Sequence, residues 1–208
     1  PLGEYTTEAN GRAIVPYTDY QHLLTSNDSK WAVVVTETKS PPNYFSAKGT
    51  AKTQTLYLER GDSMSFIFEN APYFDLDIAK FLQGTNKLLD GAKFDIYING
   101  TKAFEGISGK SGTGMLNIDK TTLGEYLEKT GLTQWIFKVV ETDPPEGHVL
   151  STPNYMEQTI NIGYSGTVYF AFGNPPTTEF LLFKQNDKGE PLKGAGFEIY
   201  IDNVKAFT

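Results

Sequence analysis

Short runs in which apolar and polar residues alternate recur along the chain, separated by turns rich in glycine, proline and asparagine. This pattern is typical of β-strands that bury one face. In the middle of the chain it predicts strands over residues 75–82, 92–98, 102–104, 115–118, 134–142, 158–162 and 166–172. Asn99-Gly100 is a strong hairpin signal, and residues 121–130, followed by Gly131, predict one short helix.

The same pattern reaches both ends of the chain. It predicts strands over residues 13–15, 31–36, 53–58 and 64–69, and a short helix over 18–24 with Thr18 as its N-cap. Toward the C-terminus, an apolar run over 180–183 follows Glu179 and leads to Lys184, a polar turn comes next, and residues 197–200 alternate as a strand. The whole chain is therefore predicted to be β-structure with minor helical insertions.

These elements belong to an internal repeat. The segments WAVVVTE at 31–37 and WIFKVVE at 135–141 start 104 residues apart, and a Pro-Pro pair follows each. GAKFDIY at 91–97 matches GAGFEIY at 194–200 with a spacing of 103, which a one-residue deletion in a turn explains. Two further pairs keep the spacing of 104: Asn70 with Asn174, which end FIFEN and YFAFGN, and Lys80 with Lys184.

The expected domain boundaries follow from the positions at which each copy of the repeat begins and ends. Residues 74–176 form one complete unit, residues 1–73 are the later two-thirds of a preceding unit, and residues 177–208 are the first third of a following one. Seven or so short strands at this spacing suggest a sandwich of two sheets. The sequence thus predicts an all-β fold of tandem β-sandwich repeats with a short helical insertion.

The composition and the net charge of the chain argue against several classes of protein. Hydrophobic residues make up 39% and charged residues 21% of the 208 residues, which favours a folded chain over a disordered one. A net charge of −7 with scattered basic residues argues against nucleic-acid binding. No run of 18 apolar residues is present, so no membrane insertion is expected. Without cysteine, the fold cannot rely on disulfides.

Enzymatic turnover is not expected. The two histidines, His22 and His148, are unrelated by the repeat, and the sequence has no metal-ligand cluster, phosphate-binding loop or nucleophile elbow. We therefore expect no metal and no cofactor. The Arg60-Gly61-Asp62 tripeptide suggests integrin binding, but Gly-Asp after a strand is ordinary hairpin chemistry, which is the favoured interpretation.

Three motifs occur in a fixed order and in two copies. The best example of the first motif is at 184–200, where Lys184 and a polar turn precede GEPLKGAGFEIY. The second motif is VETDPPEG at 140–147, and the third is FGN at 172–174. Together they resemble the Cna-B type (SpaA-like) repeat of adhesins and pilins of Gram-positive bacteria. The resemblance implies an Ig-like or prealbumin-like β-sandwich, an extracellular location at the cell surface or cell wall, and a structural role in a stalk or pilus-like fibre.

The resemblance also implies a covalent cross-link. Many such repeats form a spontaneous isopeptide bond between a lysine on the first strand and an asparagine on the last, assisted by an acidic residue on a strand between them. In the complete unit these positions are Lys80, Asn174 and Glu141. In the flanking units they are Asn70 with Glu37, and Lys184.

Elementary chemistry favours this reaction if the core is dry. A lysine is nucleophilic only when neutral, and burial lowers its pKa. A buried, neutral Glu141 would polarise the Asn174 amide and carry protons, while packing would hold the groups in contact. The alternative interpretation is a hydrogen-bonded cluster without a bond, or side chains on solvated strand faces.

The incomplete ends leave two kinds of partner open. The tail of one molecule, with Lys184, can complete the head of another, with Asn70, in a head-to-tail assembly. Alternatively, neighbouring repeats of a tandem array supply both pieces. For the function, a structural stalk module is preferred to a ligand-binding adhesin module that contacts a host surface through its loops; an exposed aromatic patch would favour the latter.

Overall fold

The computed structural model describes residues 2–24, 29–46, 52–109 and 113–206. It divides the chain into two compact units, Pro1–Pro175 and Pro176–Thr208. No helix in the described ranges is both long and apolar enough to cross a membrane.

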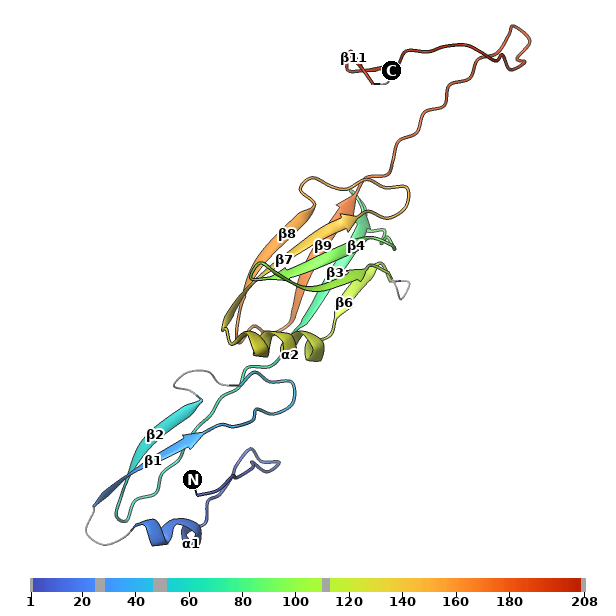
Figure 1. The fold of residues 1–208 in the computed structure, drawn as a ribbon. Helices are drawn as coiled ribbons and strands as arrows, with labels where there is room; N and C mark the ends of the chain where they lie inside the picture. The colour runs from blue at the N-terminus through green and yellow to red at the C-terminus, as the bar shows by residue number, and fades with distance from the viewer. Residues whose placement is uncertain (1, 25–28, 47–51, 110–112, 207–208) are drawn as a thin grey trace. The chain divides into compact units, whose positions relative to one another are not determined.

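The central part of the first unit is a sandwich of two β-sheets (Figure 1). One sheet has the strand order β6-β3-β9, and the other has the order β5-β4-β7-β8. The strands are β3 (Asp75–Leu82), β4 (Lys93–Ile98), β5 (Thr101–Ile107), β6 (Met115–Ile118), β7 (Gln134–Asp143), β8 (Tyr155–Asn161) and β9 (Thr167–Asn174). The prediction of an all-β sandwich with a short helix is confirmed, and β3 and β6 have the predicted bounds.

The first and last strands of this sandwich lie side by side. β3 pairs with β9 in parallel, and the register places Lys80 opposite Phe172 and Leu82 opposite Asn174. β6 pairs with the other edge of β3, so β3 is the central strand of its sheet. Because parallel neighbours cannot be joined by a tight turn, the pair encloses nearly the whole repeat.

The core fills the space between the two sheets. On β4, β7 and β9, buried residues, most of them apolar, alternate with more exposed ones, as period-two alternation requires. The buried residues include Leu76 and Ile78 on β3, Phe94 and Ile96 on β4, Trp135, Phe137 and Val139 on β7, and Val168, Phe170 and Phe172 on β9.

Helix α2 (Lys120–Thr130) closes one end of the sandwich (Figure 1). Asp119 caps it, because its carboxylate accepts hydrogen bonds from the backbone N–H groups of Thr121 and Thr122, both at 3.0 Å. The hydrogen bond from the Thr122 hydroxyl, together with these backbone bonds, lowers the pKa of Asp119. Gly131 ends the helix in the left-handed conformation, as predicted, with φ of 72°.

The N-terminal part of the first unit contains an antiparallel pair, β1 (Lys30–Thr36) with β2 (Thr53–Glu59), and two short helices, α1 (Tyr17–Tyr20) and η1 (Gln21–Leu23). Both strands were predicted within one residue at each end. A loop from this part enters the core of the complete repeat: Phe45 is 1% exposed and stacks on Trp135 with ring centroids 5.3 Å apart.

Three predictions for this part are wrong. Residues 13–15 are exposed and form no strand. Thr18 does not cap a helix: the N-cap of α1 is Pro16, and the Thr18 hydroxyl donates to Asp19 instead. Residues 64–69 are not a strand, although their exposure alternates as a strand's does. They lack backbone pairing, because no strand described in this part forms a ladder with them.

The second unit contains one short hairpin, β10 (Tyr200–Ile201) with β11 (Val204–Lys205). Asp202 and Asn203 form its turn with φ of 49° and 66°, the signs that a type I′ turn requires. The predicted strand at 197–200 is therefore reduced to its last residue, and the apolar run at 179–184 is exposed and forms no strand. Among the described residues, no strand pairs with 179–184, and the segment at 197–201 pairs only with β11.

Candidate functional site: a buried lysine, glutamate and asparagine

Three polar side chains lie inside the apolar core of the complete repeat. Lys80 comes from β3, Glu141 from β7 and Asn174 from β9, and each residue is 0% exposed. Lys80 is at the centre of its sheet, and Glu141 reaches it from the opposite sheet. The alternation of β7 explains this placement, because Glu141 continues the inward series of Trp135, Phe137 and Val139.

The three side chains contact one another. The Lys80 ammonium lies 3.0 Å from Glu141 Oε1 and 3.2 Å from Oε2, and it also donates to Asn174 Oδ1. Asn174 Nδ2 donates to Glu141 Oε1 at 2.8 Å. Each of the three groups, the amine, the amide and the carboxyl group, therefore contacts the other two. Every described buried side-chain nitrogen and oxygen has a hydrogen-bond partner.

The surroundings of Lys80 are apolar. Its ammonium is 6.0 Å from the centroid of the Phe172 ring, which packs against Phe94. Burial lowers the pKa of Lys80, and the hydrogen bond and charge of Glu141 oppose this shift only in part. Its position in the core thus shifts the Lys80 amine toward its neutral, nucleophilic form.

Two further polar groups complete the site, and sequence analysis did not identify them. The Ser151 hydroxyl lies 3.2 Å from Asn174 Oδ1 and also contacts the carbonyl oxygen of Gly173. The Asn154 side chain donates to the Glu141 backbone carbonyl at 2.9 Å, and the Asn154 backbone carbonyl accepts from Glu141 N–H at 2.8 Å. Both residues lie in the loop before β8, which has no periodic pattern to signal inward side chains.

The counterparts in the flanking parts are only partly assembled. Asn70 Nδ2 donates to Glu37 Oε2 at 3.0 Å, as Asn174 donates to Glu141, and it also donates to the Phe45 carbonyl at 3.0 Å. Asn70 and Glu37 are half-buried, whereas Asn174 and Glu141 are fully buried. Lys184 lies in the second unit and is exposed.

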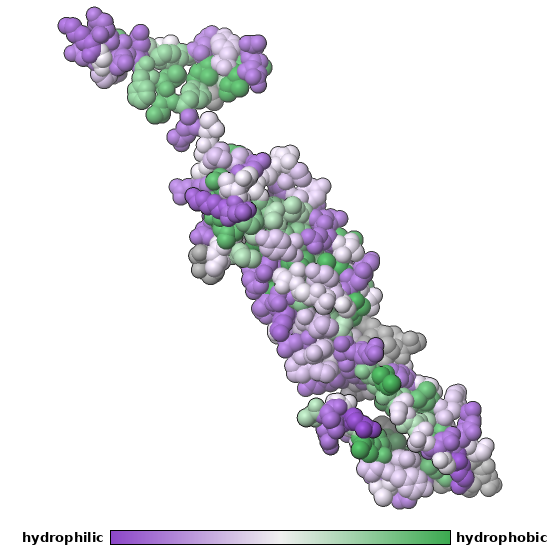
Figure 2. Space-filling view, turned by 180° about the vertical axis from the view of Figure 1, so that it is seen from behind, coloured by the Kyte–Doolittle hydropathy of each residue, from purple (hydrophilic) through white to green (hydrophobic). Residues whose placement is uncertain are grey.

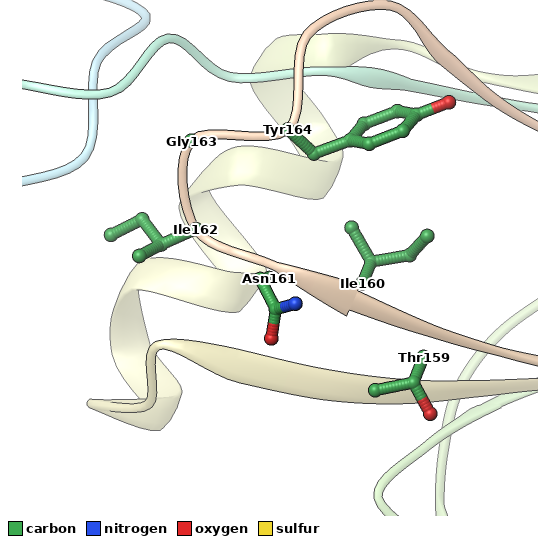
Figure 3. Close-up of a pocket in the computed structure, with 6 residues that line it drawn as sticks. All are labelled: Thr159, Ile160, Asn161, Ile162, Gly163 and Tyr164. Atoms are coloured by element: carbon green, nitrogen blue, oxygen red, sulfur yellow. The ribbon is translucent and has the colours of Figure 1, made fainter.

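No other described feature offers comparable chemistry. A shallow hollow lies at the end of β8, lined by residues 159–164 (Figure 3). Ile160 and Ile162 supply its apolar surface, and the Tyr164 ring packs against Phe74. Within the described ranges, no group of three histidine, cysteine, aspartate or glutamate side chains is placed to hold a metal ion. The Arg60-Gly61 turn follows β2 as predicted, with the Arg60 guanidinium 5.7 Å from the Trp31 ring.

Comparison with known proteins gives distant structural similarities. No family model matches the sequence, and no curated protein matches it. Among solved structures, the chain is similar to the full-length major pilin SpaD from Corynebacterium diphtheriae, with 18% identity, a TM-score of 0.36 and 53% of this chain covered. It is also similar to the Bacillus anthracis TIE protein, with 17% identity, a TM-score of 0.40 and 83% of this chain covered. The chain spans 32% of the length of SpaD and 28% of that of the TIE protein.

Proposed function

We propose that this chain is a structural module of a stalk or pilus-like fibre on the surface of a Gram-positive bacterium, stiffened by an autocatalytic isopeptide bond between Lys80 and Asn174. The observation that carries the proposal is the buried contact of the Lys80 amine with the Asn174 amide and the Glu141 carboxylate. A buried cluster of this kind is costly unless its charges are neutralised or paired. Bond formation removes the amine charge permanently.

The geometry supports a balanced reaction. Glu141 takes a proton from the Lys80 ammonium, and both groups become neutral. Lys80 Nζ then attacks Asn174 Cγ, and the developing negative charge on Oδ1 faces the Ser151 hydroxyl at 3.2 Å. Glu141 gives its proton to Nδ2, which lies 2.8 Å from Oε1. The Cγ–Nδ2 bond breaks, ammonia leaves, and Glu141 takes the second amine proton.

The reaction occurs once per repeat and is not enzymatic turnover, because it consumes two side chains of the chain itself. Packing replaces substrate binding: the reacting groups are held together by the fold and gain a large effective molarity. No metal or cofactor takes part in these steps, since the carboxylate carries both protons.

The position of the bond suits a load-bearing role. Lys80 and Asn174 lie on adjacent parallel strands, the first and the last of the repeat, and are 94 positions apart in sequence. A pulling force that enters near one end of the repeat passes through the bond to the other, and the residues between Lys80 and Asn174 stay folded. A disulfide performs this function in other exported proteins, but this chain contains no cysteine.

Single-molecule stretching tests this function. We expect the wild-type repeat, pulled by both ends, to show no release of the segment between Lys80 and Asn174. The Asn174→Ala variant should release about 94 residues, which add roughly 300 Å of extended chain. Asn161→Ala, at the exposed end of β8, is the matched control and should behave as wild type. Full extension of the wild-type repeat would contradict the proposal.

A further inference from the structure

A loop of the N-terminal part supplies a buried ring to the core of the complete repeat. Phe45 is 1% exposed, and its ring centroid lies 5.3 Å from that of Trp135 and 6.1 Å from that of Phe74. Trp135 and Phe74 are themselves buried in this core. The Phe45 ring is therefore a core side chain of the complete repeat, although the residue precedes the first strand of that repeat.

The backbone of the loop is hydrogen-bonded to the segment that leads into β3. Phe45 N–H donates to the Ala71 carbonyl at 2.8 Å, and the Asn70 side chain donates to the Phe45 carbonyl at 3.0 Å. Tyr73 N–H donates to the Asn43 carbonyl at 2.8 Å. Both backbone groups of Phe45 are thus bonded, which fixes the position from which its ring enters the core.

Helix α2 of the complete repeat holds the same loop through polar contacts. The Glu128 carboxylate accepts a hydrogen bond from Ser46 N–H, with its two oxygens at 3.3 Å and 3.2 Å. The Thr121 hydroxyl donates to Asn43 Oδ1 at 2.8 Å. Thr121 lies in the first turn of α2 and Glu128 in the last turn. Because residues seven positions apart share one face of a helix, this face of α2 contacts the loop near both of its ends.

Gly124 lies between these two helix residues and allows a second ring to pack closely. Gly124 is buried, and a Cβ at this position would overlap the Tyr73 ring. Burial raises the pKa of Tyr73, and the charges of Glu128 and Glu125 raise it further, as expected for a ring packed on this helix. Glycine is a poor helix former in a helix interior, so its presence here fits the need for close approach.

The loop is a feature of the repeat rather than of one position. Val149 N–H donates to the Pro175 carbonyl at 3.1 Å, as Phe45 N–H donates to that of Ala71. Both pairs are related by the spacing of 104 residues. An apolar side chain therefore occupies the same place in the loop of both copies.

We infer that the loop at residues 43–46 is a plug, by which the N-terminal part completes the core of the complete repeat, so that the two fold as one cooperative unit. The receiving surface consists of the Trp135 and Phe74 rings and the Thr121–Glu128 face of α2. The partner that fits this surface is an aromatic side chain followed by a backbone N–H group. The inference goes beyond the proposed function, because it does not depend on a bond at Lys80.

The plug gives the chain two properties that a simple linker lacks. Folded parts that are joined only by a flexible linker move and unfold independently. Here two hydrogen-bonded segments and a shared aromatic cluster connect the parts, so bending or unfolding at this place uncovers Trp135 and Phe74. In Figure 2, hydrophilic and neutral residues make up most of the visible surface of the complete repeat. An uncovered aromatic cluster would thus be costly, and the connection resists such opening.

Amide hydrogen exchange of the full 208-residue chain tests the inference. Phe45→Ala should lower the protection of amides in β4 and β7 by on the order of 10²–10³-fold, as expected for truncation of a fully buried phenylalanine. Phe45→Leu fills part of the space and should give a smaller loss in the same strands. Tyr44→Ala removes a neighbouring ring that is 41% exposed, and as the matched control it should keep wild-type protection.

A substitution on the helix side tests the same contact with the opposite sign. Alanine in place of a helical glycine normally stabilises a helix, but Gly124→Ala should lower the protection of β1 and β7 together, because its Cβ meets the Tyr73 ring. Lys129→Ala, at an exposed position of α2, is the control and should leave protection unchanged.

Two results would overturn the inference. One is that Phe45→Ala and Phe45→Leu lower protection in β1 and β2 only, while β4 and β7 exchange as in the wild type. The other is that Gly124→Ala raises protection, as in an isolated helix. Lys80, Glu141 and Asn174 are unchanged in all these variants, so either result leaves the proposed function standing.

Discussion

The amine of Lys80 and the side-chain amide of Asn174 are in contact inside the buried core, although they are 94 positions apart in sequence. Parallel pairing of the first and last strands brings them together, and Glu141 from the opposite sheet contacts both. This contact determines the expected stability, reactivity and pH dependence of the repeat.

Removing the amide should lower the stability of the repeat. A link that closes a loop of 94 residues is worth about 4–5 kcal/mol by the loop-entropy argument for disulfides. Asn174→Ala should therefore unfold at a temperature lower by on the order of 20 °C. Calorimetry on this variant and on Asn161→Ala measures the difference. Equal melting temperatures for wild type and Asn174→Ala would show that no link forms.

Replacing the carboxyl group should be more damaging than replacing the amide. Glu141→Gln keeps the shape of the side chain but removes the proton carrier, so no bond should form. It also leaves Lys80 buried without its opposite charge, which costs about 3–5 kcal/mol for a broken buried pair. Denaturant unfolding should therefore give Glu141→Gln a lower free energy of unfolding than Asn174→Ala. The reverse order would argue against Glu141 as the partner of the buried lysine.

The Ser151 hydroxyl should affect the rate of bond formation but not its yield. It faces Asn174 Oδ1, where negative charge develops, and its loss removes one donor from that oxygen. Losing such a donor costs up to about 10²–10³ in rate in known oxyanion holes. Freshly synthesised Ser151→Ala should lose ammonia more slowly than wild type when followed by mass spectrometry over time.

A control separates this kinetic effect from misfolding. Ser165→Ala alters an exposed turn of the same repeat and should react at the wild-type rate. If Ser151→Ala loses ammonia as fast as the wild type and Ser165→Ala do, Ser151 has no role in stabilising the transition state.

The unbonded repeat should become more stable as the pH rises. Burial lowers the pKa of Lys80 in the folded state below its unfolded value of 10.5. Between these two pKa values the unfolded chain binds more protons, so the free energy of unfolding increases with pH, by at most about 1.4 kcal/mol per unit for one group. Below the folded pKa this contribution is constant.

Urea unfolding of Asn174→Ala at a series of alkaline pH values measures this increase. The Lys80→Met/Asn174→Ala double variant has no amine at the site and provides the baseline, with Glu141 present in both. Parallel pH profiles for the two variants would mean that Lys80 does not titrate in the core.

Sequence alone predicts the sandwich well because alternation is strong in the complete repeat. β3 and β6 have their predicted bounds, and the turns at Asn99-Gly100 and Gly131 have the positive φ values that those residues favour. The repeat also identifies Lys80, Glu141 and Asn174 as related positions, since each has a counterpart 104 residues away.

The wrong strand predictions and the missed residues have physical causes. Residues 64–69 and 179–184 have the composition of strands, yet a strand also needs a neighbour to bond its backbone, and sequence pattern does not report whether one is present. Ser151 and Asn154 were missed because inward side chains in loops follow no period. Phe45 was missed because its partner, Trp135, lies 90 positions away in the next repeat.

The intact mass of the folded repeat, measured under denaturing conditions, tests the central claim most directly. The account predicts a monomer mass lower by about 17 Da than the sequence requires, and a Lys80→Ala variant without that deficit. Fragmentation should place the missing ammonia on a branched peptide that contains both Lys80 and Asn174. A wild-type mass equal to that of the unmodified sequence would contradict the account.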